Sequence, residues 1–184
     1  MSSRTDTHNG PYLYPPRANV RGFAQLPFYQ NPQFPDKKTA CGLAAAFTML
    51  TNYKHKTFGD SDFENVKPNL GPFGTTAGRV EEIMKSYGGT VHFHKDATLD
   101  AGVVALKGSI VSHSPACVLL DLGAASDLKQ SWFAGHWVVA YAFDNSEVHL
   151  TNYGPMAWDS FKRCFDKTVL TNGGGMGRAH YTLT

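Results

Sequence analysis

Hydrophobic and polar positions along the chain predict helices mainly in its first half. Residues 41–52 are rich in helix formers and apolar nearly all round, which indicates a buried helix. In residues 77–87 the apolar side chains recur at i, i+3, i+4 and i+7, the spacing of one helix face. We expect a third helix near residues 99–106 and a short one near 158–165. The polar residues 54–75, rich in Gly and Pro, predict a long loop with room for one short helix.

The second half of the chain carries most of the apolar runs that are typical of strands. Expected strands lie at residues 91–94, 116–122, 135–143, 147–152 and 179–183, with a turn at 144–146 and a glycine-rich loop at 172–177. Helices come before most of the strands, without regular β-α-β alternation. The pattern therefore predicts an α+β fold, in which a helical part packs on an antiparallel β-sheet.

Composition limits the class of protein and its partners. The 184 residues fit an extended arm over residues 1–25 followed by one domain over residues 26–184. Lys and Arg number 17 and Asp and Glu number 15, so the formal net charge of +2 lacks the basic excess of proteins that bind nucleic-acid phosphates. The longest apolar runs are far shorter than a membrane span. We expect neither a nucleic-acid nor a membrane partner.

The beginning of the chain and its cysteines indicate a reducing compartment. Residues 1–9 are polar and lack the apolar stretch of a signal peptide, so we expect synthesis in the cytoplasm. Secretion, or delivery into a target cell without a cleaved signal, is the alternative. Three cysteines are an odd number and too few for a disulfide scaffold.

Cys41 is the cysteine whose position suggests reactivity. It lies where a Pro-containing loop meets the first predicted helix, and a helix N-terminus favours thiolate over thiol, which predicts a lowered pKa. Gly42 beside it leaves the backbone accessible to a substrate carbonyl. The competing interpretation is a small buried hydrophobe. Cys117 and Cys164 fall in apolar elements and are expected to be core residues.

Three further polar residues are placed to serve such a thiol. His136 opens an apolar strand, and Asn152 closes the return strand, so the hairpin brings them to within a residue or two of opposite positions. Asn152 can then orient the imidazole, and His136 can act as base. Gln30, with Gln33 as the alternative, can donate its amide to an oxyanion beside the Cys41 N–H.

The order Gln, Cys, His, Asn resembles that of the papain-like cysteine peptidases, and most closely the branch of bacteriocin-leader, or double-glycine, peptidases. There, a Gln segment like residues 26–30, Leu-Pro-Phe-Tyr-Gln, precedes one like residues 40–46, Ala-Cys-Gly-Leu-Ala-Ala-Ala. A His segment like residues 135–141 follows later. The resemblance implies a papain-like fold, with Cys41 as nucleophile and His136 as general base and acid. It also implies that Asn152 orients the imidazole and that Gln30 donates to the oxyanion.

The activity implied is cleavage of peptide bonds in a protein or peptide substrate, after a Gly-Gly motif in the leader-peptidase branch, with no cofactor or metal. Two features depart from that branch: Asn152 begins Asn-Tyr-Gly-Pro where Asp-Pro is usual, and the chain has no membrane or ATPase domain. A free-standing domain of this kind also resembles bacterial effector toxins aimed at rival or host cells, which travel with an immunity protein. Alternatives are a peptidoglycan amidase or endopeptidase, a Cys–His acyl transferase or deamidase, and a non-catalytic binding module.

Histidines elsewhere give a weaker signal. His92 and His94 form a His-x-His pair, with His113 and Cys117 later in the sequence. A zinc site needs three or four converging ligands, and the chain has neither Cys-x-x-Cys nor His-Glu-x-x-His. We therefore expect exposed strand and loop histidines here.

Overall fold

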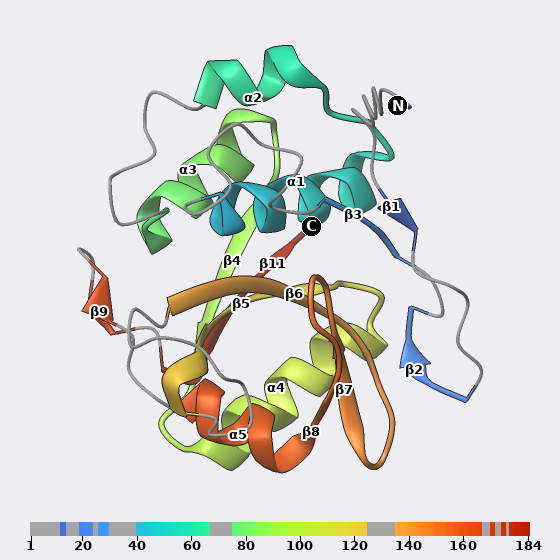
Figure 1. The fold of residues 1–184 in the computed structure, drawn as a ribbon, viewed down its shortest axis with the longest axis vertical. Coiled ribbons are helices and arrows are strands. Elements are labelled where there is room, and N and C mark those ends of the chain that lie inside the picture. The colour runs from blue at the N-terminus through green and yellow to red at the C-terminus, as the bar shows by residue number, and fades with distance from the viewer. Residues whose placement is uncertain are drawn as a thin grey trace, which may run out of the picture.

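A seven-stranded antiparallel sheet runs through the middle of the protein, with helices on both faces (Figure 1). The structure is a computed structural model, and it describes residues 12–13, 19–23, 26–29, 40–66, 75–124, 135–166, 170–171, 174–175 and 177–184. The strand order is β4 (Val91–Lys95), β11 (Ala179–Leu183), β5 (Ala116–Asp121), β6 (Gly135–Phe143), β7 (Glu147–Leu150) and β8 (Gly154–Ala157), with β2 (Arg21–Gly22) also paired to β6. The α+β class with an antiparallel sheet, predicted from the sequence, is confirmed.

The helices divide between the two faces of this sheet. One face carries α1 (Cys41–Lys54) and α3 (Ala77–Ser86), with α2 (Asp60–Val66) beyond them; the other carries α4 (Leu99–Val111) and α5 (Trp158–Asp166) (Figure 1). Each face has its own cluster of buried apolar side chains. The short pairs β1 (Tyr12–Leu13) with β3 (Pro27–Phe28), and β9 (Leu170–Thr171) with β10 (Gly174–Gly175), lie outside the main sheet, and η3 (Leu122–Ala124) follows β5.

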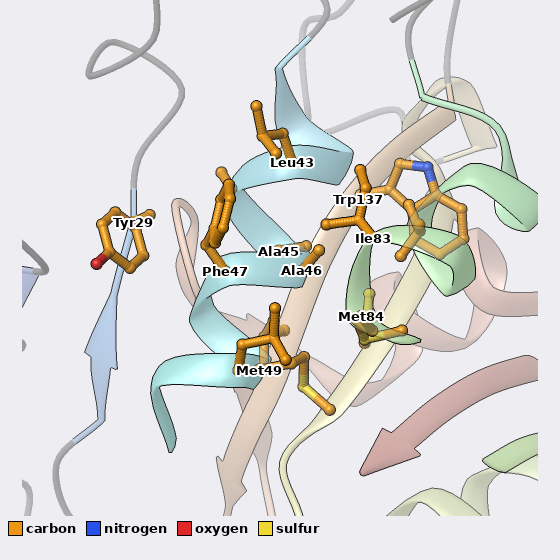
Figure 2. Packing of buried hydrophobic residues seen from close by; sticks show 14 of the residues in the cluster. Tyr29, Leu43, Ala45, Ala46, Phe47, Met49, Ile83, Met84 and Trp137 are labelled. Atoms are coloured by element: carbon orange, nitrogen blue, oxygen red, sulfur yellow. The ribbon is translucent and has the colours of Figure 1, made fainter. Parts of the chain in front are cut away.

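Helix α1 is buried over most of its length because it lies between the sheet on one side and aromatic side chains on the other. Leu43, Ala45, Ala46 and Met49 belong to the same cluster as Ile83, Met84 and Trp137, which Figure 2 shows. On the opposite side of the helix Phe47 faces Tyr29 (Figure 2). This two-sided burial explains why the sequence of α1 is apolar nearly all round.

Residues 26–29 are held against α1 and the segment that follows it by hydrogen bonds. Tyr29 donates its backbone N–H to Thr48 Oγ1 at 2.9 Å, and Asn52 Nδ2 donates to the carbonyl of Pro27 at 3.0 Å. The Tyr29 hydroxyl donates to the carbonyl of Phe58 and accepts from the Phe58 N–H, at 3.0 and 2.7 Å. Polar groups that burial would leave unpaired therefore fix the register of β3 against the helix.

Differences from the predicted elements concern the ends of elements and the Gly-rich segments; α4, expected near residues 99–106, runs to Val111. The return strand β7 ends at Leu150, two residues short of the expected end, because the chain turns at residues 151–153. Strand β8 was not expected, since Gly and Pro at its start are rare in strands. Within the predicted glycine-rich loop, Gly174–Gly175 pair with β9. Strands β1 and β2 fall within the predicted arm, and the division at residue 25 stays a prediction.

A stacked pair of histidines, one buried and one half-buried, joins strands β4 and β11. His180 and His94 are direct cross-strand partners whose rings stack at 4.6 Å, and His180 is fully buried. His180 Nε2 lies 3.2 Å from the hydroxyl of Ser109 on α4. Burial, and then the charge of His94, lower the pKa of His180 to about 4. The folded protein therefore holds this imidazole neutral where an unfolded chain would be protonated.

Stability is expected to fall as the pH drops from about 6.5 towards 4, because the unfolded state takes up a proton that the folded His180 refuses. The contribution of His180 is fully present above the unfolded pKa. Melting temperatures measured across this range test the prediction. His180→Gln should make the fall shallower, and the part that remains includes that of His136, whose pKa burial also lowers to about 4; His55→Asn, at an exposed position, should leave the profile unchanged. A wild-type melting temperature that stays constant from pH 7 to 4 would contradict it.

Within the described ranges, no helix is both long and apolar enough to cross a membrane.

Candidate active site

Cys41 is the first residue of α1 and lies against strand β6. Its side chain is buried, with 7% of the residue exposed. The backbone N–H groups of Trp137 on β6, of Gly42 and of Cys41 itself are close enough to the sulfur to act on the pKa of the thiol. The N-terminus of the helix and the strand that carries His136 therefore meet at this thiol.

Burial has the larger effect on the thiol. It raises the pKa of Cys41 above its usual value, and the three backbone N–H groups lower that pKa by less. The lowered pKa expected from the helix N-terminus is thus outweighed by loss of solvent. In this conformation Cys41 is a thiol that needs a base to be activated.

His136 is the second residue of β6, directly before Trp137. Its Nε2 is buried and has no hydrogen-bond partner among the described residues. Burial lowers the pKa of His136 to about 4. The imidazole is therefore neutral at neutral pH, which is the form able to accept a proton from a thiol.

Asn152 lies in the turn between β7 and β8, not in a strand. The backbone pairing of β6 with β7 ends at Thr151, just before Asn152. The Thr151 N–H donates to the carbonyl of Val139, and the Thr151 hydroxyl oxygen accepts from the Val139 N–H, both at 2.9 Å. Asn152 then adopts a left-handed conformation with φ 66°, which Asn tolerates better than most residues. The next residue, Tyr153, contacts the His136 ring, so the turn reaches the imidazole.

The orienting hydrogen bond expected from Asn152 is not made to Nε2 in this conformation, since that nitrogen has no partner within the described part of the chain. The triad role of Asn152 therefore stays a prediction. Gln30 and its alternative Gln33 lie outside the described residues. Tyr29, directly before Gln30, is fastened to α1.

Trp137, whose backbone lies beside the Cys41 thiol, was not singled out from the sequence. Besides its backbone N–H, its indole Nε1 donates to the carbonyl of Thr75 at 2.7 Å. Thr75 in turn packs against Gly42, which holds the start of α3 next to the start of α1. The signal in the sequence was position alone: Trp137 directly follows the candidate base.

Gly42→Ala is expected to disturb this junction, because the added methyl would lie 2.9 Å from Thr75 Oγ1 and still closer to its Cβ. The free energy of unfolding should drop by about 1–3 kcal/mol, and alkylation of Cys41 should become slower. Urea unfolding and the alkylation rate measure the two effects. Gly78→Ala is the matched control, since nothing lies within 4 Å of a methyl there, and it should be neutral or stabilising. Equal behaviour of the two variants would argue against a tight junction.

Histidines and carboxylates elsewhere form one further cluster among the described residues. Asp144, Glu147 and His149 place one ligand atom each within 4.8 Å of one another, at the far end of the β6–β7 hairpin. Asp144 already accepts hydrogen bonds from Ser146 and from the Glu147 N–H, as the cap of a turn. His92 and His94 contact Thr184 and Thr182 across the strands.

Comparison with known structures identifies the fold. No family model matches the chain, and no curated protein matches it. Eleven chains of known structure do. One, described as a C39-like peptidase from Bacillus anthracis, matches with a TM-score of 0.64 and 13% identity over 90% of this chain and 98% of the other. The chain has a C39-like peptidase fold.

A second structure with this fold is the peptidase domain of Streptococcus ComA, a bifunctional ABC transporter involved in quorum sensing. It matches with a TM-score of 0.51 and 14% identity, over 79% of this chain and 91% of the other. The predicted papain-like fold and its resemblance to the leader-peptidase branch are therefore confirmed for the architecture. At such low sequence identity the shared fold does not show the activity, so the activity of this protein has to be argued from its own residues.

Proposed function

We propose that this protein is a cysteine peptidase, in which Cys41 is the nucleophile and His136 the general base and acid. The observation that carries the proposal is the meeting of α1 and β6. The backbone N–H of Trp137 is close enough to the Cys41 thiol to lower its pKa, and His136 is the adjacent residue on that strand. The similarity of the fold to two chains described as peptidases supports the proposal.

The chemistry follows from the protonation states. Cys41, with its raised pKa, starts as a thiol, and His136, with a pKa of about 4, starts neutral. His136 takes the thiol proton as the sulfur bonds to the substrate carbonyl carbon, and the C=O electron pair moves to oxygen. Collapse of this intermediate breaks the C–N bond, and His136 gives its proton to the departing amine. Water, deprotonated by His136, then hydrolyses the thioester.

The oxyanion needs donors close to the attacked carbon. Backbone N–H groups at the start of α1 are suited to this, since those of Cys41 and Gly42 lie beside the thiol and lower its pKa. Gln30 is the proposed side-chain donor, as the residue directly after the fastened Tyr29. Asn152 is proposed to orient His136 from the β7–β8 turn.

The substrate we propose is a protein or peptide, with cleavage after Gly-Gly as the first motif to test. The experiment is incubation with a protein mixture and with Gly-Gly peptides, followed by mass-spectrometric mapping of new N-termini. New termini that Cys41→Ala does not produce, and Cys164→Ala does, support a peptidase. Cleavage of purified sacculi with no new protein termini would instead assign a peptidoglycan substrate. Delivery as an effector toxin, and inhibition by an immunity protein, are predictions that rest on the sequence resemblance.

A further inference from the structure

The turn that carries Asn152 has an unusual backbone. Asn152 and Gly154 both have positive φ, 66° and 76°, and they flank Tyr153. A left-handed backbone conformation costs free energy for most residues, and Asn and Gly adopt it most readily. Strained backbone of this kind tends to be found at functional sites. The sequence supplies the two residue types that tolerate it. The turn therefore directs Tyr153 in a defined way.

Tyr153 is directed at the candidate base. Its ring lies edge-to-face with the His136 imidazole, with centroids 5.2 Å apart and planes at 81°. The Tyr153 ring is partly buried and packs against the apolar cluster beneath β7, β8 and α5. It thus connects His136 to the buried apolar cluster on that face of the sheet.

This contact matters because one of the two ring nitrogens of His136 is not oriented by a hydrogen bond within the described chain. Its Nε2 is buried there without a hydrogen-bond partner. An imidazole without a hydrogen bond at that nitrogen is fixed by packing, and an aromatic edge-to-face contact favours one ring orientation. A base must be held in the correct orientation to reach the thiol.

We propose that Tyr153 is a positioning residue, whose ring holds the His136 imidazole towards Cys41 and keeps water away from it. The kinetic consequence rests on the proposed function, whereas the effect on the imidazole itself does not. Trp137, although it follows His136, turns its indole towards Thr75 on the other side. Tyr153 is therefore the aromatic side chain seen to contact His136 in the described residues.

Burial is the cause that lowers the pKa of His136 to about 4. The titratable groups on the described elements around it are Cys41 at the start of α1, Asp121 on β5, which pairs with Gly135, and Tyr153 itself. None of these charges contributes to the lowered pKa. Removal of the Tyr153 ring should hydrate the imidazole, so that the pKa of His136 moves up towards its usual value of about 6.5.

The test compares Tyr153→Ala, Tyr153→Leu and Tyr153→Phe by NMR titration of the histidine rings, with His136→Gln to assign the signal. In Tyr153→Ala and Tyr153→Leu, the pKa of His136 should rise to about 5 or more, and Tyr153→Phe should keep the wild-type value. Tyr53→Ala, which removes a half-buried tyrosine from the other cluster, is the control and should leave it unchanged. The leucine variant retains apolar volume if the alanine variant fails to fold.

Kinetics gives the second readout. On a peptide substrate, Tyr153→Leu should lower kcat about tenfold with little change in KM. The acid limb of the plot of kcat against pH should shift to higher pH. An unchanged pKa of His136 in both Tyr153→Ala and Tyr153→Leu would overturn the proposal. A raised pKa in a protein that cleaves no peptide would uphold the role of Tyr153 and contradict the peptidase assignment alone.

Discussion

Cys41→Ala is expected to lower kcat on a peptide substrate at least about 10³-fold, because no other group can form the thioester. The fold should survive, since Cys41 lies at the end of α1 and alanine is small, apolar and a good helix former. A melting temperature within a few degrees of wild type would show this. Cleavage rates and thermal unfolding are the two measurements.

The matched control for Cys41→Ala is Cys164→Ala, which removes a thiol from α5 on the opposite face of the sheet. It should retain activity and lose stability, because its side chain is fully buried. Activity that persists in Cys41→Ala, after repurification excludes a contaminating peptidase, would contradict the nucleophile assignment.

Phe47→Ala is expected to lower the free energy of unfolding by about 3–5 kcal/mol, a large share of the stability of a domain this size. Phe47 is fully buried in α1. Its ring contacts those of Tyr29, Phe58, Phe63 and Tyr87, with centroids 4.7 to 6.1 Å away. The cavity would separate α1 from the segments that cover its outer side.

Urea unfolding of Phe47→Ala measures the loss, and Phe93→Ala is the control. Phe93 has the same side chain but lies on the edge strand β4, 49% exposed, so its removal should cost far less. Because Tyr29 precedes Gln30 and packs on Phe47, the alanine variant should also slow catalysis at temperatures where it remains folded. Similar losses in the two variants would argue that α1 is not held by this cluster.

Sequence patterns predicted the elements with strong periodicity and missed those fixed by particular contacts. Helix α3 and strands β5 and β6 follow from apolar spacing, and the structure places them within a residue or so of the expected bounds. Strand β8 begins with Gly and Pro, whose local preference is overridden by pairing with β7. The fold class could be predicted because it depends on the order of helices and strands along the whole chain, and not on the exact ends of any one element.

For the candidate site, the sequence indicated residue types and not their surroundings. It led to Cys41 and His136, but gave no measure of burial, so the predicted direction of the Cys41 pKa was wrong. Tyr153 was missed because its contact with His136 depends on two positive φ angles in the turn. The spacing of apolar residues predicts helices and strands and gives no information on the backbone conformation of a turn.

The rate of iodoacetamide alkylation at each cysteine, followed by mass spectrometry near pH 7 in the wild type and in His136→Ala, tests the central claim most directly. If His136 activates Cys41, then Cys41 reacts faster than Cys117 and Cys164, which are fully buried, and its rate falls about tenfold or more in His136→Ala. Equal rates at the three thiols, or a Cys41 rate that does not change when His136 is removed, would contradict it.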